Sequence, residues 1–167
     1  LFDNNRQISF RLFAGTFLYN KSSNSNTFDF GLSTINDYLF EQELLGRSEK
    51  SGIFSQQFIM GEGGFKSKVI PEYVNKWLVT TNISFNVWNW IEVYGDLGLV
   101  KNSEIRERWV YDNGIRFNFM TDYFEVYFPV YSNNGWEIAQ PKYGEKVRIV
   151  LTLDPKVLVN LFTRKWF

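Results

Sequence analysis

The chain has neither cysteine nor histidine among its 167 residues. Without cysteine there is no disulfide and no thiolate ligand, and without histidine there is no HExxH zinc motif and no Ser-His-Asp or Cys-His arrangement. Carboxylates, lysines and tyrosines are the groups that remain for chemistry. We therefore expect no cofactor, no metal site and no hydrolytic catalysis within these residues.

Long apolar runs and a net charge are lacking as well. No run approaches the roughly 20 apolar residues that a transmembrane helix requires, but a barrel strand needs only about 9–11 residues with an alternating pattern. Lys and Arg number 18, as do Asp and Glu, and this balance argues against nucleic acid as a partner. The chain begins at Leu1 rather than Met, so we expect a mature or cut piece of a protein.

Aromatic residues, by contrast, are abundant. The chain has 17 Phe, 9 Tyr and 6 Trp, which together make up 19% of its residues. Membrane barrels use such residues on lipid-facing strands and in girdles at both interfaces. The length fits one domain of about 100–200 residues, and we assign residues 1–153 to a barrel and 154–167 to a short periplasmic C-terminal tail.

Residues 77–100 show the clearest strand pattern. From Trp77 to Val87, the odd-numbered residues are mostly apolar and the even-numbered residues are mostly polar, and the same alternation continues from Ile91 to Leu99. Successive side chains point to opposite faces of a strand, so each of these strands has one apolar and one polar face. If the apolar face points outward the protein is a membrane barrel, and if the polar face does it is a soluble one.

The same pattern along the chain predicts eight strands and one helix. The strands are expected at 7–19, 27–46, 53–65, 77–87, 91–100, 108–120, 123–131 and 144–153. Residues 27–46 form either one long strand or two strands with a turn near 35–37. Residues 66–76 are expected to form a long loop. Asp154 as N-cap and Pro155 at the first helical position predict a short amphipathic helix at the end of the chain.

The predicted connections alternate in length. They are long at 20–26, 66–76, 101–107 and 132–143, and short at 47–52, 88–90 and 121–122. Outer-membrane barrels have long loops outside and short turns in the periplasm. We therefore expect an all-β fold, namely an eight-stranded antiparallel transmembrane β-barrel with a short C-terminal amphipathic helix. It should lie in the lipid bilayer of a bacterial outer membrane with both termini in the periplasm.

The predicted polar faces contain charges of both signs. We expect these to pair across a narrow lumen: Arg11, Glu92, Asp96, Asp112, Arg116, Glu125 and Arg148. An eight-stranded barrel is just wide enough for side chains to fill it, so the lumen should be plugged rather than an open pore. The alternative is a soluble, lipocalin-like barrel that binds a hydrophobic ligand inside and exposes these charges to water.

Three other patterns have competing interpretations. Trp77, Trp88 and Trp90 lie near predicted strand ends, where membrane-interface anchoring is a better explanation than a sugar site. The glycine-rich run at 61–64 lacks the Gly-Lys-Ser/Thr ending of a phosphate loop, so we favour a bulge or a close backbone approach there. Glu41 and Glu43 lie on one predicted strand face, and we favour pairing with lumen arginines over an acid-base or metal-binding pair.

Two stretches resemble known proteins. On the last predicted strand, Lys142, Gly144, Val147 and Ile149 follow the order polar, glycine, hydrophobic and hydrophobic, which resembles the signal by which bacterial outer-membrane proteins are recognised for insertion. The segments NDYLFEQELLGRSEKSGIFSQQFIMGEGGFKSK and PKYGEKVRIVLTLDPKVLVNLFTRKWF resemble the C-terminal region of large gluzincin-type metallopeptidase-family proteins of Bacteroidota.

This second resemblance covers most of the chain from Asn36 onward. It implies a zinc peptidase unit upstream, none of whose motif residues occurs in this chain. It also implies that the chain itself is a non-catalytic membrane anchor or scaffold, within an assembly of other outer-membrane or periplasmic domains.

Overall fold

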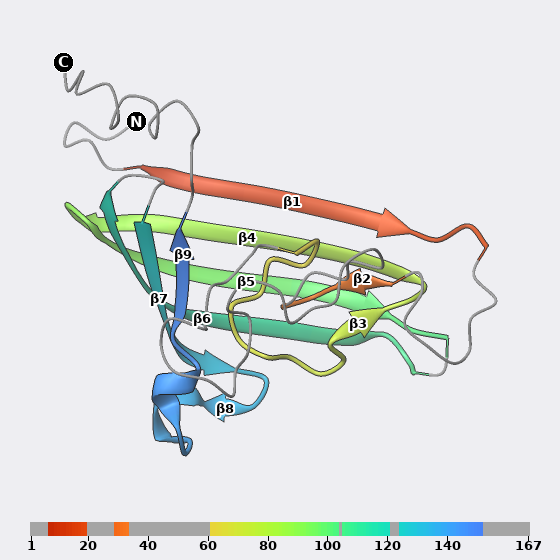
Figure 1. Ribbon diagram of the computed structural model, residues 1–167. Helices are drawn as coiled ribbons and strands as arrows, with labels where there is room; N and C mark the ends of the chain where they lie inside the picture. Colours follow the sequence, from red (N-terminus) through yellow and green to blue (C-terminus); the bar gives the residue numbers. More distant parts are fainter. Residues whose placement is uncertain (1–6, 20–28, 34–60, 104, 121–123, 152–167) are drawn as a thin grey trace, which may run out of the picture.

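An antiparallel sheet dominates the computed structural model, which describes residues 7–19, 29–33, 61–103, 105–120 and 124–151. The strands of this sheet are β1 (Ile8–Thr16), β4 (Trp77–Trp88), β5 (Ile91–Lys101), β6 (Arg108–Met120), β7 (Phe124–Ser132), β8 (Gly135–Trp136) and β9 (Arg148–Leu151). Their order is β1-β4-β5-β6-β7, and both β8 and β9 pair with β7. Figure 1 shows β1, β4, β5 and β6 side by side, with β7 and β9 crossing them steeply.

Two shorter features complete the described part of the fold. β2 (Phe30–Gly31) and β3 (Tyr73–Val74) form a separate two-stranded sheet, which lies over one face of the main sheet (Figure 1). The connection from β8 to β9 contains two 3₁₀ turns, η2 (Glu137–Ala139) and η3 (Tyr143–Glu145). Apart from the two 3₁₀ turns, the regular secondary structure of the described residues is therefore antiparallel β-sheet, as the sequence pattern predicts.

The main sheet has two open edges within the described residues, where β1 pairs only with β4 and β9 only with β7. Closure into an eight-stranded barrel therefore stays a prediction. The predicted C-terminal helix at 154–167 lies outside the described residues, as does most of the predicted strand at 27–46.

The β4–β5 hairpin forms as the alternation at 77–100 predicts. Trp77 lies opposite Lys101 and Asn86 opposite Glu92, and a bulge precedes the turn. The turn residue Asn89 has a φ of 29°, a conformation that Asn tolerates better than most residues. Its carbonyl accepts a 2.7 Å hydrogen bond from Asn86 Nδ2, which closes the turn.

The two ends of the sheet differ in their connections. At one end, Ile8 lies opposite Phe85 and Phe124 opposite Leu151, next to the turn at 89–90 and the connection at 121–123; we call this the short-turn end. At the other end, the chain leaves β1 at Thr16 opposite Trp77 and also makes the connections at 102–107 and 133–147. We call this the long-loop end.

The predicted strands at 27–46 and 53–65 are wrong where the structure describes them. Residues 29–33 form only the two-residue β2, and residues 61–65 lie in no strand. The described parts of these two stretches contact each other through backbone hydrogen bonds: Gly63 N donates to Gly31 O at 2.9 Å and Phe65 N to Leu32 O at 3.0 Å. A Cβ on Gly63 would lie 2.7 Å from the Leu32 Cα, so glycine permits the close backbone approach.

Much of the predicted long loop at 66–76 lies against the sheet. Lys66, Ser67, Val69 and Val74 are all buried, because this stretch lies against the main sheet. Leu32, Phe65 and Val69 pack with sheet residues Leu78, Val100 and Val110 in a small hydrophobic core. This core sits near the long-loop end, where these sheet residues lie.

The last predicted strand, 144–153, begins later than expected. Gly144 lies in η3, and the strand starts at Arg148. Two contacts fold this stretch into turns instead: Tyr143 Oη donates to Pro129 O at 2.8 Å, and Lys146 Nζ donates to the Glu137 carboxylate. Residues 152–153 lie outside the described residues.

The close packing at Gly114 generates a testable prediction. A Cβ there would lie 2.2 Å from Phe128 O and 2.7 Å from Tyr94 Oη, so Gly114→Ala forces the backbone of β7 to shift. We expect the substitution to lower the free energy of unfolding by about 1–3 kcal/mol. Denaturant unfolding of the folded chain measures this change.

Gly95→Ala is the matched control, because a Cβ on Gly95 meets nothing within 4 Å. Its effect should stay within about 0.5 kcal/mol. Equal losses for the two variants would contradict the packing described for Gly114.

Candidate functional site

The main sheet buries its polar face and exposes its apolar face. On β4 the even-numbered residues from Leu78 to Ser84 are buried, while Val79 and Ile83 are more than two-fifths exposed. β5 repeats the pattern. Its even-numbered residues from Glu92 to Val100 are buried, while Val93 and Leu97 are also more than two-fifths exposed. A sheet in water normally does the reverse. We call the covered face the inner face and the opposite one the outer face.

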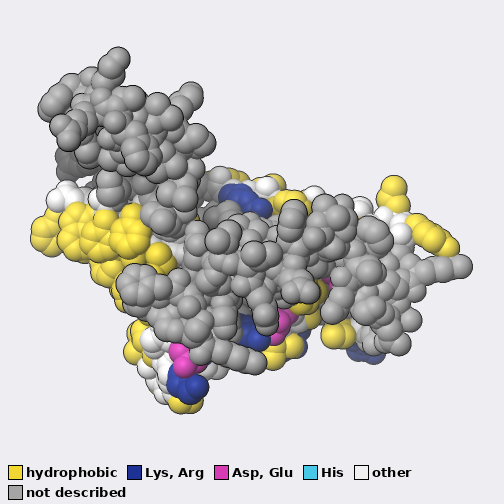
Figure 2. Space-filling model, in the orientation of Figure 1, with side chains coloured by type: hydrophobic (Ala, Val, Ile, Leu, Met, Phe, Trp, Pro, Cys, Tyr) yellow, Lys and Arg dark blue, Asp and Glu magenta, His cyan; other side chains and the backbone are white. Residues whose placement is uncertain are grey.

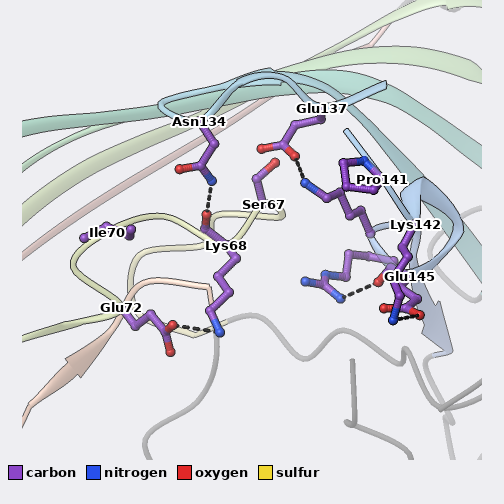
Figure 3. A pocket seen from close by; sticks show the side chains of 11 residues that line it. Ser67, Lys68, Ile70, Glu72, Asn134, Glu137, Pro141, Lys142 and Glu145 are labelled. Atoms are coloured by element: carbon purple, nitrogen blue, oxygen red, sulfur yellow. Dashed lines mark hydrogen bonds and ion pairs between the residues drawn. The ribbon is translucent and has the colours of Figure 1, made fainter. Parts of the chain in front are cut away.

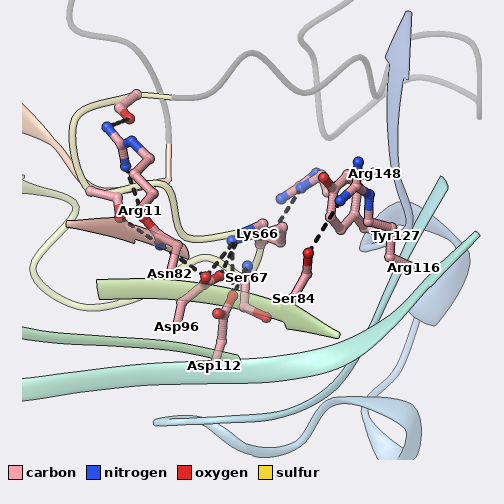
Figure 4. Close-up of polar contacts among 12 residues, drawn as sticks. Arg11, Lys66, Ser67, Asn82, Ser84, Asp96, Asp112, Arg116, Tyr127 and Arg148 are labelled. Atoms are coloured by element: carbon pink, nitrogen blue, oxygen red, sulfur yellow. Dashed lines mark hydrogen bonds and ion pairs between the residues drawn. The ribbon is translucent and has the colours of Figure 1, made fainter. Parts of the chain in front are cut away.

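The inner face is covered by residues 61–74, which we call the inner segment. Side chains from five strands make hydrogen bonds to the backbone of this segment or to the Lys66 ammonium group. They are Arg11 of β1, Asn82 of β4, Asp96 of β5, Asp112 of β6 and Arg148 of β9. Figure 4 shows Asp96, Asp112 and Arg148 meeting at Lys66 and Ser67, with Asn82 and Arg11 beside them. The inner face therefore binds one segment of its own chain along most of its width.

Lys66 forms the central ion pair of the inner face. Its Nζ lies 2.8 Å from Asp96 Oδ2 and 2.9 Å from Asp96 Oδ1, and the side chains of Lys66 and Asp96 are 4% and 0% exposed. Asn82 Nδ2 donates a further 2.8 Å hydrogen bond to Asp96. The ammonium group also lies 5.1 Å from the ring centre of Tyr94 and 5.6 Å from that of Tyr127, which adds cation–π attraction.

Asp112 lies directly opposite Asp96 in the β5–β6 ladder. Two carboxylates so placed repel each other, and the repulsion is strong where water is excluded. Asp112 Oδ2 accepts hydrogen bonds from the backbone N–H groups of Lys66 at 2.8 Å and Ser67 at 2.5 Å. The inner segment therefore supplies one cation and two N–H donors to a pair of buried acids.

A second charged cluster surrounds Arg116 near the short-turn end. Its guanidinium binds Glu92 at 2.9 Å and also pairs with Glu125. Tyr127 Oη donates a 2.6 Å hydrogen bond to Glu125, and Asn118 Nδ2 donates to Glu92 at 3.3 Å. One guanidinium group thus bridges two carboxylates from neighbouring strands, which orients the strands as well as neutralising the acids.

The remaining predicted lumen charges, Arg11 and Arg148, bind neutral groups. Arg11 donates to Asn82 Oδ1 at 2.8 Å and to Glu62 O at 2.9 Å. Arg148 Nε donates to Lys66 O at 3.1 Å. Together with the two clusters above, all seven charges predicted for a lumen make contacts on the inner face.

Sequence reasoning missed Lys66 as the partner of Asp96, because it assigned this lysine to a long loop between strands. It also missed Asn82, Tyr94 and Tyr127 as contributors to the network. The strand alternation places Asn82, Tyr94 and Tyr127 on the polar face, so these three residues could have been predicted from the sequence. Nothing in the sequence around Lys66 indicates burial.

Aromatic side chains gather at both ends of the outer face. At the short-turn end, Trp90 stacks on Phe119 at 5.3 Å between ring centres, Phe119 stacks on Phe124 at 5.9 Å, and Trp88 is 70% exposed. Figure 2 shows hydrophobic side chains concentrated at the end of the sheet where the β4–β5 hairpin turns. The predicted anchors Trp88 and Trp90 belong to this group.

The second aromatic group lies at the long-loop end. Trp109 is 57% exposed, and the predicted anchor Trp77 lies on the same outer face at the start of β4. Tyr131 stacks on Tyr111 at 5.9 Å and meets Trp136 edge to face at 5.3 Å. The aliphatic positions of the outer face thus lie between two aromatic rows.

The residues of the predicted insertion signal do not share one strand. Lys142 has a φ of 60° and precedes η3, Gly144 lies in η3, and Val147 is buried just before β9. Ile149 is in β9 and lies opposite Val126. The pattern therefore covers a turn followed by the first residues of the strand.

A cavity of about 290 Å³ lies between the inner segment and the β8–β9 connection. Figure 3 shows its charged side chains in pairs, with Lys68 on Glu72 and Lys142 on Glu145. Glu137 binds Lys146 in the same cavity. The cavity is thus lined by neutralised pairs and offers no convergent set of free catalytic groups.

Other site classes find no support in the described residues. No group of three or more His, Cys, Asp or Glu residues there is placed to hold a metal ion. No helix in this part of the chain is long and apolar enough to cross a membrane. Comparison of the chain with family models, with curated proteins and with solved structures found no match.

The Lys66–Asp96 pair gives a second prediction. Lys66→Met leaves two buried carboxylates without their cation, and breaking a buried pair in this way costs about 3–5 kcal/mol. We expect a loss of that size in the free energy of unfolding, measured by denaturant titration. Adding Asp96→Asn should restore most of it, because the uncompensated charge is removed.

Lys101→Met is the matched control, because the Lys101–Glu107 pair has the same 2.8 Å separation but is exposed. An exposed pair contributes less than about 1 kcal/mol. If Lys66→Met and Lys101→Met destabilised the chain equally, the inner segment would not be held by this ion pair.

Proposed function

We propose that this chain is a non-catalytic outer-membrane β-barrel domain that anchors or scaffolds a larger assembly. The observation that supports this most is the inversion of the sheet, whose polar face is covered while its aliphatic and aromatic face is exposed. In water, so large an exposed apolar surface is unfavourable. In lipid, the same arrangement is stable, since the exposed side chains meet hydrocarbon and the charges stay inside.

The dimensions of the outer face fit a bilayer. From Trp77 to Val87 on β4 there are about 10 residues at about 3.3 Å each, or roughly 33 Å along the strand. Barrel strands tilt by about 40°, which reduces this length to about 25 Å across the membrane. The apolar band of an outer-membrane barrel is also about 25 Å tall and is bordered by aromatic girdles, as the aromatic rows at Trp88 and Trp109 border this one.

The filled inner face favours anchoring over transport. The inner segment occupies the polar face, and its contacts with Asp96 and Asp112 are buried and paired. A conducting barrel needs a continuous aqueous path along such a face. In the proposed barrel, closure joins the edges of β1 and β9, and the lumen is occupied by protein.

The first and last residues that the structure describes are placed in agreement with the predicted topology. Gln7 and Leu151, at the two ends of the described sheet, both lie at the short-turn end. In outer-membrane barrels that end is periplasmic, so an attached domain would stand in the periplasm. The resemblance to the C-terminal region of Bacteroidota metallopeptidase-family proteins makes a peptidase unit our proposed attachment.

The soluble, lipocalin-like alternative requires the opposite arrangement. Its apolar residues would line a ligand cavity and its charges would face water. Ile83 and Leu97 instead lie on the exposed face, and Asp96 lies against the inner segment. A chain that stays soluble without detergent and purifies with a bound lipid would favour this alternative over the membrane barrel.

Arginine substitutions on the outer face test the proposal. Ile83 is 44% exposed in the middle of β4, so Ile83→Arg places a charge near the proposed bilayer midplane. We expect a loss of about 2–4 kcal/mol in the free energy of unfolding from lipid vesicles. On a solvated surface the same change would be nearly neutral.

Val87→Arg provides the matched control. Val87 is 46% exposed on the same face, close to the short-turn end, where the cost of arginine in a barrel falls to about 0–1 kcal/mol. A neutral result at Ile83, together with solubility of the chain without detergent, would rule out the membrane interpretation.

A further inference from the structure

Basic residues gather at the long-loop end of the sheet, whereas the residues next to the turn at 89–90 are uncharged. Lys76, Lys101, Arg106 and Arg108 lie at the long-loop end, and Glu107 is the acidic neighbour that pairs with Lys101. At the short-turn end, residues 86–91 and 117–120 contain no charged residue. The two aromatic rows of the outer face therefore differ in charge.

The register places basic and aromatic side chains together at the long-loop end. Trp77 lies opposite Lys101 and Leu99 opposite Trp109, so Lys101 sits between the two tryptophans on the outer face. Lys101 Nζ donates a 2.8 Å hydrogen bond to Glu107, and this contact holds the pKa of Glu107 below its usual range. Glu107 thus pairs with Lys101.

Arg106 and Arg108 flank this pair, and both are exposed. No ion pair among the described residues includes either arginine. A guanidinium group matches the geometry of a phosphate and binds it in bidentate fashion. The neighbouring start of β6 is fixed, because Asn133 Nδ2 donates to Trp109 O at 3.2 Å and Asn133 Oδ1 accepts from Tyr111 N at 2.5 Å.

We propose that this end of the barrel binds phosphate-bearing lipid headgroups through Arg106 and Arg108, with Trp77 and Trp109 beside them at headgroup depth. Tryptophan prefers the membrane–water interface, and Trp109, which directly follows Arg108, lies on the apolar outer face opposite Leu99. A free phosphate or a phosphorylated protein would make no contact with that adjoining apolar face, whereas a lipid would. The inference rests on the proposed membrane function.

The experiment compares two lipids in vesicles that contain the inserted full chain. Quenching of tryptophan fluorescence by brominated phosphatidylglycerol and by brominated phosphatidylcholine gives the relative affinity for an anionic and a net-neutral headgroup. We expect the wild type to prefer phosphatidylglycerol, and Arg106→Gln and Arg108→Gln each to lower that preference about fivefold. High salt should weaken the preference in the wild type.

Lys68→Gln is the control, since Lys68 is also exposed but belongs to the inner segment and pairs with Glu72. This variant should retain the wild-type preference. An unchanged preference in the Arg106→Gln and Arg108→Gln variants would overturn the headgroup site while leaving the barrel intact. Failure of the wild type to insert into phosphatidylcholine vesicles would overturn the proposed membrane function itself.

Discussion

The placement of Lys66 against Asp96 and Asp112 is the contact on which the inner face depends. The two acids lie directly opposite each other on neighbouring strands, and each is buried. Without a cation and N–H donors, such a pair would push β5 and β6 apart or draw in water. The inner segment supplies both, and this is why a stretch of the chain that looks like a surface loop lies inside.

Once the inner segment is held there, its apolar residues have a defined place to pack. Phe65 directly precedes Lys66 and Val69 comes three residues after it. Both therefore lie close enough to pack in the small core with Val100 and Val110. The electrostatic contact therefore positions the hydrophobic one. Because the inner face is filled in this way, the outer face is the surface through which the sheet meets its surroundings, and that surface is apolar.

The strands from 77 to 132 were predictable because their information is local. Period-two alternation over a dozen residues defines a strand and its two faces, and Asn89 supplies the residue type that the turn needs. The charged residues of the inner face followed from the same alternation. For this reason Arg116, Glu92 and Glu125 could be assigned to one face before any contact between them was known.

The inner segment was not predictable because its contacts are distant in sequence. Lys66 lies 30 residues from Asp96 and 46 from Asp112, and the glycines before it carry no alternation. Gly63 and Gly64 instead permit close approaches, to Leu32 and to the Asn82 side chain. Similarly, β1 pairs with β4 across the whole stretch 17–76, whereas a local rule pairs each strand with the next one along the chain.

The topology assigns different tasks to the two ends of the proposed barrel. The chain leaves β1 and returns to β4 at the long-loop end, so the inner segment is inserted from the side that also carries Arg106, Arg108 and Trp109. The ends of the described sheet, in contrast, lie at the short-turn end. A domain attached there would therefore be held at the opposite end from Arg106, Arg108 and Trp109. An anchor needs this separation, because the attached domain can then move without disturbing the contacts that fix the barrel in lipid.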